Sequence, residues 1–574
     1  MKLPAASWLF PSLRGYRREW LRGDLIAGLT VWAVLVPEAL AYASIAGVSP
    51  VVGLYAAPGA LLFYAAFGSS RHLVTGPMSA TAALSAATVA EYATAGSSTF
   101  TTMTAALAIS AGAAAALAGL LRMGFLASFI SEPVMKGFIV GLALTIIAGQ
   151  LPKLFGVEKG SGDFFQKVWD VITKLGDTHA VTLLIGLVSL AIVLGLRRIA
   201  PVVPGSLVAV AFGIAAVEIF NLDDHGVEIV GHINRGLPSV GLPDLSFHDY
   251  LKLVGGGIGV MLVGFAEGLG AAKTYAVRHH YEVDANRELL GLGAANLAAG
   301  LSSGMVVNGS LSKTAVNGSA GANSQLSGLF VAVMTIVTLL LLTGVFEKLP
   351  EATLAAVVIA AVLELVDVPG LVRLYRVYSR RLGRAYGVAA RPDFIAAIAA
   401  LLGVTLFDTL PGLFIGIATS LILLLYRASR PRIAELGKVP GTKDQYGDIE
   451  RHPENVVRAG IVVLRVESGL FFANSDWIRS RLRAAASRPG TKAVVLDAAT
   501  VASLDITAAE MLDQAAEDLR QRQVVLLLAR DIGPVRSILR HADADEQLER
   551  TYSSVQAAVE AAEHDFTWAG AGRS

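Results

Sequence analysis

Two acidic residues stand alone inside long apolar stretches of this chain. Glu38 is the only charged residue within 25–70, and Glu267 is the only one within 253–272. Ionisable groups in such surroundings usually face a partner or a water-filled pathway, and they mark the routes of ions and protons. We therefore interpret Glu38 and Glu267 as candidate coupling residues. The alternative is a structural role in which each carboxylate pairs with a lysine.

A single lysine lies in a polar segment between two apolar runs. Lys313 is the only charged residue within 289–346, and it belongs to VVNGSLSKTAVNGSAG, which spans 306–321. An isolated ammonium group is unfavourable there, so Lys313 must face water, pair with a partner, or extend to an interface along its aliphatic stem. A cation in the first turn of a helix is opposed by the helix dipole, and it gains most when an anion lies in front of it.

Glycine-rich breaks interrupt the apolar pattern at Gly76 and at Gly309. Proline suits the first position of a helix, so we expect one short helix to begin at Pro77 and another near Ser310. Half-helices that begin inside a membrane direct unpaired N–H groups and positive dipole ends at one point, where an anion can bind. The alternative is close helix packing, in which Ser and Thr side chains bond to the backbone.

The apolar region contains an internal repeat. VWAVLVPEALAYA from Val31 aligns with VMLVGFAEGLGAA from Val260, which places the two lone glutamates at equivalent positions. TGPMSATA from Thr75 aligns with NGSLSKTA from Asn308. The residue numbers differ by 229 in the first pairing and by 233 in the second, and chance matches would not be expected to agree so closely. The repeat predicts two related halves, as in many transporters.

The composition indicates a polytopic membrane protein. Hydrophobic residues make up 54% of the 574 residues and charged residues only 16%, which is too apolar for a soluble protein of this length. Long apolar runs begin near Leu25, Thr182, Leu329 and Phe394, and several can cross a hydrocarbon core of about 30 Å. The first run continues without a small-residue cleavage site, so we interpret it as a span and not as a signal peptide. The absence of cysteine excludes disulfides.

The chain changes character after Tyr426. A charged segment rich in proline and glycine is followed by the apolar runs IVVLRV, KAVVLDA and VVLLLA, which alternate with the helix-like stretches SDWIRSRLRAAAS and TAAEMLDQAAEDLRQR. Strands that alternate with helices predict a compact α/β domain. Arginines precede the first apolar run and follow the last, so both ends are expected to be cytoplasmic, with an even number of spans between them.

Motifs for several other chemistries are missing from the sequence. It has no zinc-ligand spacing, no phosphate-binding P-loop and no nucleophile elbow. His279 and His280 lie beside Arg278 in an expected loop, and we interpret them as solvated side chains. We therefore expect no enzyme activity, no ATP-driven pumping, no metal site, no cofactor and no nucleic-acid partner.

Four parts of the chain carry a resemblance to a known family. They are LRGDLIAGLTVWAVLVPEALAYASIAGVSPVVGLYAA, YEVDANRELLGLGAANLAAG, NGSLSKTAVNGSAGANSQLSG, and FFANSDWIRSRL with VVLDAATVASLDITAAEML near the end. Over nearly its whole length the chain resembles the SulP sulfate-permease family of anion transporters, whose animal relatives include prestin and pendrin.

The resemblance implies an α-helical polytopic membrane protein with a C-terminal cytoplasmic α/β STAS domain. Its fourteen spans would form two inverted seven-helix repeats, divided between a gate domain and a core domain. The expected parts are a cytoplasmic N-terminal segment at 1–22, a transporter domain at 23–428 with repeats at about 23–220 and 250–428, a linker at 429–458, the STAS domain at 459–565, and a tail at 566–574.

Carried over to this chain, the resemblance places an anion between the third and tenth spans. The substrate-binding residues that it implies are Lys313, Ser312, Leu311, Met78, Ser79 and Tyr42, with Glu38 and Glu267 as coupling residues.

This chain departs from many members of the family. Many have glutamine where it has Glu38, and many have arginine where it has Lys313. A carboxylate that faces an anion is repulsive unless it is protonated or paired, so Glu38 indicates that a proton travels with the anion. Lysine lacks the bidentate fork that favours planar oxyanions. In the STAS domain LDITAAE replaces the loop that is phosphorylated in anti-sigma-factor antagonists, so Thr507 is a poor candidate for phosphorylation.

We predict a secondary active transporter of a small anion such as sulfate, bicarbonate, chloride or a dicarboxylate. A proton is the candidate coupling ion, and an elevator motion would carry the core domain past the gate domain. Two alternatives stay open: a nucleobase permease of the same fold, which Glu267 fits and Lys313 does not, and an uncoupled anion channel. We expect a homodimer in the bilayer of the inner (plasma) membrane, with both termini cytoplasmic.

Overall fold

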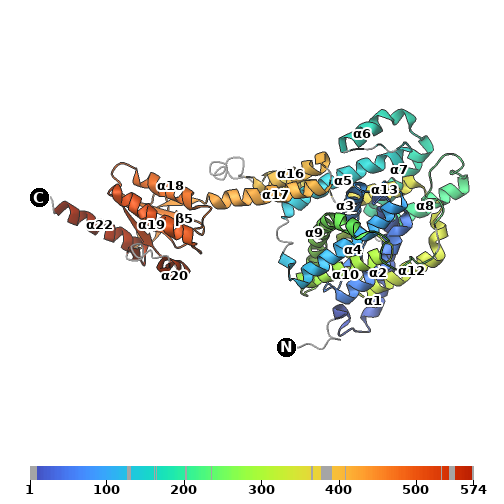
Figure 1. Ribbon diagram of the computed structural model, residues 1–574, viewed down its shortest axis with the longest axis horizontal. Helices are drawn as coiled ribbons and strands as arrows, with labels where there is room; N and C mark the ends of the chain where they lie inside the picture. The colour runs from blue at the N-terminus through green and yellow to red at the C-terminus, as the bar shows by residue number, and fades with distance from the viewer. Residues whose placement is uncertain are drawn as a thin grey trace. The chain divides into compact units, whose positions relative to one another are not determined.

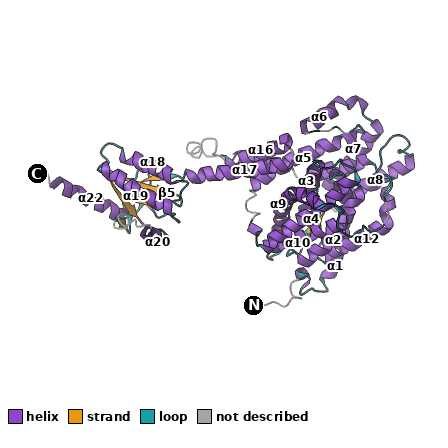
Figure 2. Cartoon of the chain, viewed as in Figure 1, coloured by secondary structure: helices purple, strands orange, loops and turns teal. Residues whose placement is uncertain are grey.

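The structure is a computed structural model that describes residues 9–125, 131–158, 160, 162, 164–200, 203–233, 236–363, 366–376, 391–407, 409–531, 533–541 and 550–571. The chain divides into two compact units, Met1–Val377 with Asp393–Ser420, and Tyr378–Pro392 with Leu421–Ser574. The first unit consists mainly of helices (Figure 1). The larger sheet lies in the second unit (Figure 2).

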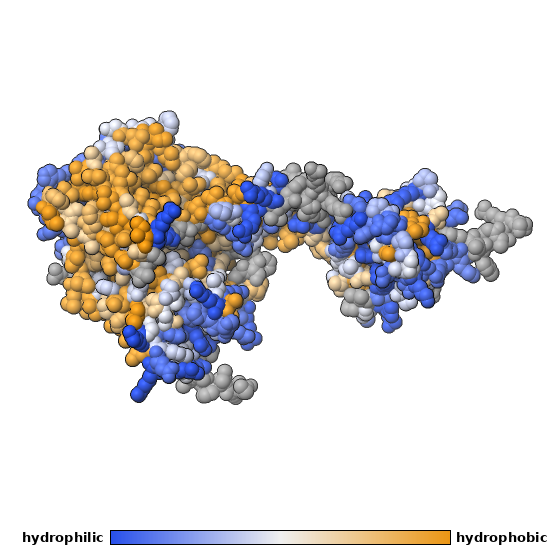
Figure 3. Space-filling model, turned by 180° about the vertical axis from the view of Figure 1, so that it is seen from behind, coloured by the Kyte–Doolittle hydropathy of each residue, from blue (hydrophilic) through white to orange (hydrophobic). Residues whose placement is uncertain are grey.

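Long apolar helices dominate the first unit, and they confirm the predicted polytopic membrane protein. Among the described residues, nine helical segments are long and apolar enough to cross a membrane: α1 (Trp20–Ile45), α2 (Pro50–Phe67), α4 (Ser98–Leu120), α5 (Glu132–Phe155), α7 (Ala180–Ile199), α9 (Phe247–Arg278), Leu326–Phe346, Glu351–Arg376 and Pro411–Ser429. Shorter apolar helices are α3 (Ser79–Ala90), α8 (Gly205–Phe220) and α16 (Pro392–Phe407). The visible face of this unit is largely hydrophobic (Figure 3), as a lipid-facing surface must be.

Further helices complete this part of the chain. They are α6 (Phe164–Thr173), α10 (Ala285–Leu301), α11 (Leu311–Ser319), α12 (Leu326–Val337), α13 (Glu351–Leu363), α14 (Val368–Arg376) and α17 (Thr409–Ser429). α12 continues as a π-helix, Thr338–Leu342, and a 3-10 turn, Thr343–Phe346. Two other short 3-10 turns are Pro11–Leu13 and Leu175–Asp177.

The same order of elements occurs twice in the first unit. α1, α2, strand β1 (Val74–Gly76) and α3 follow one another, and α9, α10, strand β2 (Asn308–Ser310) and α11 follow in the same order. β1 and β2 pair in an antiparallel register, with Thr75 opposite Gly309. The two glycine-rich breaks therefore lie side by side, and each leads into a short helix.

Glycines allow α4 and α10 to pack closely. A Cβ atom at Gly293 would lie 2.7 Å from the backbone nitrogen of Ala116, and one at Gly112 would lie 2.6 Å from that of Leu297. Real side chains do not fit at such distances, so the two backbones can approach only because these positions are glycine. α10 also packs on α2, and α4 packs on α9, so the helices around the breaks form one block.

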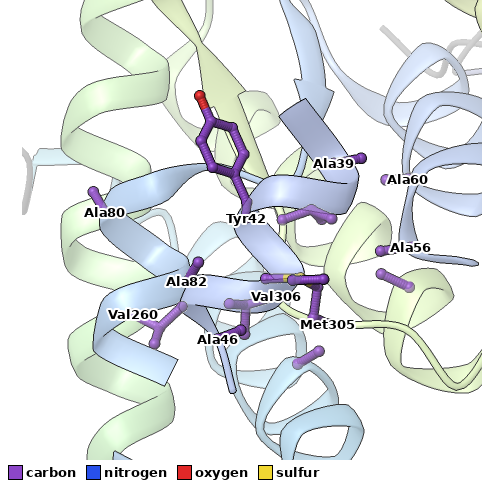
Figure 4. Packing of buried hydrophobic residues seen from close by; sticks show 14 of the residues in the cluster. Ala39, Tyr42, Ala46, Ala56, Ala60, Ala80, Ala82, Val260, Met305 and Val306 are labelled. Carbon is purple, nitrogen blue, oxygen red and sulfur yellow. The ribbon is translucent and has the colours of Figure 1, made fainter. Parts of the chain in front are cut away.

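Small apolar side chains fill the interior of this block. Figure 4 shows part of the buried cluster, which contains Ala39 and Ala46 of α1, Ala56 and Ala60 of α2, Ala80 and Ala82 of α3, Val260 of α9, and Met305 and Val306 before β2. The ring of Tyr42, which belongs to the same cluster, extends away from Ala46 and Val306 in this view (Figure 4).

Two buried carboxylates fasten loops to the block. Asp24 of α1 accepts hydrogen bonds from the backbone nitrogen and the hydroxyl of Ser324, at 3.1 and 2.7 Å. Glu288 of α10 accepts from the hydroxyl of Tyr64 and the backbone nitrogen of Ser69, at 2.7 and 2.8 Å. Both carboxylates are fully buried and several donors satisfy each of them, so they hold the ends of helices in fixed positions.

The second unit contains a six-stranded sheet with the strand order β4-β3-β5-β6-β7-β8. Its elements are β3 (Ile433–Lys438), β4 (Tyr446–Asp448), β5 (Ile461–Val466), α18 (Ser475–Ala486), β6 (Ala493–Asp497), α19 (Ile506–Gln521), β7 (Val525–Ala529), α20 (Gly533–His541), β8 (Thr551–Tyr552) and α22 (Val555–Ala571). β5, β6, β7 and β8 pair in parallel. One apolar cluster joins the sheet to α18, α19 and α20, and another joins it to α22. The three strands and two helices predicted from the sequence are confirmed.

The segment predicted to be a linker, 429–458, contains part of this sheet. β3 pairs with β5, and β4 pairs with β3, both antiparallel. The prediction missed them because charged residues, proline and glycine dominate the segment and hide the short alternating pattern of IAELGK. In that strand Ala434 and Leu436 are buried, which is enough to attach it to the sheet.

Candidate functional site

The short helices α11 and α3 begin where β2 and β1 end. Ser310 caps α11, because its side-chain oxygen accepts a hydrogen bond of 3.2 Å from the backbone nitrogen of Lys313. Met78 occupies the same position before α3, with an extended backbone and no side-chain hydrogen bond. The first N–H groups of a helix have no partner inside it, so the N-terminus of α3 retains donors that its cap residue does not satisfy.

The helix start predicted at Pro77 is wrong. Pro77 lies between β1 and Met78, and α3 begins only at Ser79. The fixed φ of proline suits extended backbone as well as the first turn of a helix, and here the residue ends the strand. Its carbonyl oxygen accepts a hydrogen bond of 3.2 Å from the Nζ atom of Lys313.

Lys313 lies at the centre of the site. Its Nζ atom is 2.7 Å from the Oε2 atom of Glu38 and 5.0 Å from the centroid of the Tyr42 ring. The lysine side chain is only 1% exposed. The alternative in which Lys313 extends to an interface is therefore wrong, and the ammonium group is stabilised by an ion pair, a carbonyl oxygen and an aromatic face.

Glu38 and Tyr42 reach the lysine from α1. They are four residues apart, so they project from the same face of the helix. Among the described residues Glu38 is the acid that pairs with Lys313, and its side chain is 11% exposed. The pairing with a lysine that we considered for both acids is thus present for Glu38.

Glu267 has a different environment. Its Oε2 atom accepts a hydrogen bond of 3.2 Å from the Nδ2 atom of Asn308, the first residue of β2. Gly264 and Gly268 lie on either side of it along α9, and a Cβ atom at either would lie 3.2 Å from Asn308 Oδ1, so both glycines admit the amide. In the described part of the chain Glu267 forms no ion pair, in contrast to Glu38.

The other predicted site residues differ in their exposure to solvent. Leu311 is 53% exposed, and Ser312 is also exposed, with its hydroxyl 3.1 Å from that of Ser310. Ser79 is buried and Met78 is half-buried. Over the described residues the side chains of Met78 and Ser79 form no hydrogen bond with Lys313. The α3 side of the site contacts the lysine through the backbone that precedes the helix.

Sequence reasoning missed three residues that shape the site. They are Pro77 and Asn308, already described, and Thr314, whose hydroxyl accepts a hydrogen bond of 3.1 Å from the backbone nitrogen of Val74. Thr314 therefore joins α11 to β1. A signal for Asn308 was present, because the repeat aligns it with the polar residue Thr75 at the start of the other break.

His72 fixes the loop that leads from α2 into β1, outside the spans. Its Nε2–H donates to the carbonyl of Ala322 at 3.0 Å, and in the neutral ring Nδ1 accepts from the Tyr281 hydroxyl at 3.1 Å. The ring also stacks on His279, with 4.2 Å between the centroids. Burial lowers the pKa of His72 to about 4, with smaller contributions from His279 and Arg71. The imidazole is therefore neutral at physiological pH.

The site combines elements that suit an anion. One full positive charge lies at the N-terminus of α11, beside the N-terminus of α3, and a carboxylate already occupies the position in front of it. An incoming anion can compete with Glu38 for Lys313. Among the residues that the structure describes, no group of three or more His, Cys, Asp or Glu side chains is arranged to hold a metal ion.

Two known sequence families match this chain. The sequence pattern of the "Sulfate permease family" matches residues 21–381, and that of the "STAS domain" matches residues 452–558. A probable sulfate transporter of Mycobacterium tuberculosis is 36% identical over 552 residues, which cover 96% of this chain and 96% of that protein. Such relatives are named as transporters and not as enzymes.

Two solved structures share the fold. The murine anion transporter Solute Carrier 26 family member A9, in an inward-facing state, superposes with a TM-score of 0.86 at 22% identity, covering 98% of this chain and 94% of that one. The transmembrane domain of the cyanobacterial bicarbonate transporter BicA superposes with a TM-score of 0.61 at 23% identity, covering 69% of this chain and 98% of that one.

Proposed function

Because this chain belongs to the sulfate permease family and carries a C-terminal STAS domain, we propose that it is a secondary active transporter of a small inorganic or carboxylate anion. The chain is a multi-pass membrane protein of an anion-transporting family. The Mycobacterium tuberculosis relative is named as a probable sulfate transporter, and BicA, which shares the fold, is named as a bicarbonate transporter. These two anions, with chloride and dicarboxylates, are the substrates to test first.

The observation that carries the proposal is the burial of Lys313 between the two breaks. A lysine that is 1% exposed, contacts Pro77 just before the cap of α3 and lies in the first turn of α11 supports an anion position between these helix N-termini. Its contacts would come from Lys313 and Ser312, with the backbone near Leu311, and from Met78 and Ser79 opposite. Tyr42 would close the site beside Glu38.

The ion pair supports coupling to a proton. While Glu38 is ionised, it neutralises Lys313 and repels an incoming anion. Protonation of Glu38 would remove both effects, so an anion and a proton would enter together. Glu267 is the second candidate for the coupling residue, because it lies at the equivalent repeat position and forms no ion pair over the described residues.

The repeated order of elements supports two related halves of seven spans each. The first would be α1, α2, α3, α4, α5, α7 and α8, and the second α9, α10, α11, α12, α13, α16 and α17, in inverted orientation. We place the transporter domain at 23–428, with repeats at about 23–220 and 250–428, and the STAS domain from just before β3 (Ile433–Lys438) to residue 565. The first four helices of each half would form the core domain that moves past the gate domain as an elevator.

Topology and assembly follow from the same reasoning. The arginines at both ends support cytoplasmic termini, which require an even number of spans, and we infer that the protein lies in the plasma membrane. We also infer a homodimer, in which each partner would bury exposed apolar surface of the other.

Uptake by purified protein in proteoliposomes tests the proposed function. Labelled sulfate should enter, an inward proton gradient should drive it uphill, and a panel of unlabelled anions should compete in order of affinity. Uptake that never runs uphill would indicate an uncoupled channel. Competition by nucleobases and not by anions would support the nucleobase alternative, which the Glu267–Asn308 contact fits.

A further inference from the structure

The helix α6 has no role in the site described above. It consists of FFQKVWDVIT, Phe164–Thr173, between the spans α5 and α7. In Figure 1 it lies on the opposite side of the first unit from the N-terminal segment. Ten residues are too few to cross a bilayer, since a span needs about 20.

One side of α6 is apolar over a broad arc. Val171 is buried, and Phe164 and Val168 are half-buried on the side where the helix packs on α5. The arc continues into three residues that the protein leaves uncovered, Phe165, Trp169 and Ile172, which are 53%, 66% and 52% exposed. They follow the spacing i, i+4, i+7, which places them in one stripe.

Polar residues complete the circumference of the helix. At about 100° per residue, Gln166, Lys167, Asp170 and Thr173 occupy the remaining arc, opposite the apolar one. The helix is therefore amphipathic. Part of its apolar arc packs on α5, and the adjoining part, which carries the exposed stripe, is not covered by the described residues. A soluble surface would not be expected to present two aromatic residues and an isoleucine in one uncovered stripe.

Two contacts fix α6 at the level where the neighbouring spans end. The backbone nitrogen of His179, just before α7, donates to the carbonyl of Phe155 at the end of α5, at 3.0 Å. The Nζ atom of Lys174, just after α6, donates to the carbonyl of Glu158 at 3.3 Å. These contacts hold the end of α5 close to the start of α7. The segment between them, which includes α6, therefore lies at the level of these two helix ends, beside the membrane surface.

The span that follows the uncovered stripe, α7, is also apolar and exposed. α7, which follows, exposes Leu184 and Leu187 to 63% and 48%, and only 22% of its apolar window is buried. Tryptophan is the side chain most typical of the boundary between headgroups and acyl chains, because its ring is apolar and its N–H is polar. Lipid is therefore the occupant that fits the stripe.

We propose that α6 is an interfacial helix that inserts Phe165, Trp169 and Ile172 into the boundary between lipid headgroups and acyl chains. Its polar arc faces water. Because α6 packs on α5 and leads into α7, this insertion holds the adjoining ends of both spans at a fixed depth. In the elevator proposed above these spans belong to the gate domain, so the bilayer itself would restrain the part that stays still. Lipid insertion itself does not depend on that mechanism.

Site-directed spin labelling of the full-length protein tests the proposal. The chain has no cysteine, so a single introduced cysteine is labelled without background. Trp169→Cys reports on the stripe, and the matched control Lys167→Cys reports on the polar arc, about 160° away around the helix. Each nitroxide is measured in vesicles of phosphatidylcholine and phosphatidylglycerol against oxygen, which concentrates in lipid, and against a water-soluble nickel chelate.

We expect the ratio of oxygen to nickel collisions to be at least about threefold higher at 169 than at 167. Equal ratios at the two positions would show that the stripe faces water, and they would overturn the proposal. Low collision with both reagents at 169 would show that protein covers the stripe, and it would overturn the proposal as well. If Trp169→Cys does not yield folded protein, Ile172→Cys gives the same reading. These readouts involve no transport, so they stand whether or not the proposed function does.

Discussion

Lys313 has three contacts, so its removal tests the anion site most directly. Lys313→Met keeps the length and the apolar stem but removes the charge. We expect anion uptake in proteoliposomes to fall at least about tenfold, which corresponds to about 1.4 kcal/mol for a charge-assisted contact. Lys313→Arg should restore part of the uptake, with selectivity shifted toward planar oxyanions, because guanidinium binds them through two parallel hydrogen bonds.

The structure supplies the control for this variant. Glu38 is 2.7 Å from the lysine, and removing one partner of a buried pair typically destabilises a protein by about 3–5 kcal/mol. Loss of uptake could then reflect poor folding. The double variant Lys313→Met with Glu38→Gln leaves no unpaired charge, so it should fold well and still fail to take up anions. If it transports with wild-type affinity, Lys313 is only the counter-ion of Glu38, and the anion site lies elsewhere.

Glu38→Gln tests the coupling role. Glutamine has the shape of a protonated glutamate but cannot exchange a proton, and it leaves Lys313 free for the anion. We expect the initial rate of uptake to lose its dependence on pH, while anion exchange continues. Glu267→Gln is the matched variant at the other lone acid. An unchanged pH profile in Glu38→Gln leaves Glu38 with a structural role, and a flat profile in Glu267→Gln would move the coupling role there.

Composition and pattern predicted which residues matter here, but not how they contact one another. Lone charges in apolar sequence identified Glu38, Glu267 and Lys313, because charge in such surroundings is energetically unfavourable. Only the folded chain shows that the lysine pairs with Glu38 and not with Glu267. Asn308 escaped prediction because an asparagine in a Gly/Ser-rich break looks like an ordinary turn residue.

At the scale of elements, His72 couples the loop before β1 to the end of α11 and to the loop after α9. His72→Asn should destabilise the protein at pH 7 by about 1–3 kcal/mol, because the hydroxyl of Tyr281 and the carbonyl of Ala322 lose a well-placed partner. Thermal unfolding of the wild type and the variant in the same detergent measures the difference.

The same pair of proteins tests the lowered pKa of His72. The folded pKa of about 4 lies below the ordinary value of 6.5, so the stabilisation is complete above 6.5 and is lost as the pH falls. The gap between wild type and His72→Asn should narrow by roughly 1.4 kcal/mol per pH unit below pH 6.5, so a gap of about 1–3 kcal/mol closes before pH 4. The carboxylates titrate in both proteins, so their contribution to the pH dependence of stability cancels in the difference. A gap that stays constant down to pH 4 would mean that His72 is not the neutral donor of this loop.

The elements themselves were predicted well wherever their pattern is long. The spans and the strands β5, β6 and β7 have apolar runs that few other structures tolerate. The errors occurred at short features. Pro77 satisfies the rules for both a strand end and a helix start, and β3 and β4 lie in a segment whose composition is that of a linker. Local propensity cannot decide such positions, because pairing with β2 or β5 decides them.

At the scale of the whole molecule, the STAS unit has its own hydrophobic clusters on both faces of its sheet. A chain that ends after Arg430 should therefore still insert and fold, because it keeps α17 to Ser429 and removes every strand of that sheet. We expect transport to decrease and dimerisation to weaken. Extraction from membranes followed by size-exclusion chromatography measures insertion, folding and dimerisation. Uptake in proteoliposomes measures transport. Loss of all membrane insertion would contradict a separable regulatory unit.

The position of the cut gives that prediction a sharper form. Trp477 Nε1 donates to the carbonyl of Pro431 at 3.2 Å, and β3 begins at Ile433, so the STAS unit starts directly after Arg430. A chain that ends after Arg458 would keep β3 and β4 without β5, the strand on which β3 pairs. A two-stranded hairpin is marginal alone, and an unpaired strand edge promotes aggregation. The longer protein should consequently give less monodisperse material than the shorter one. Equal or better behaviour of the chain ending after Arg458 would show that 429–458 acts as a linker, independent of the sheet.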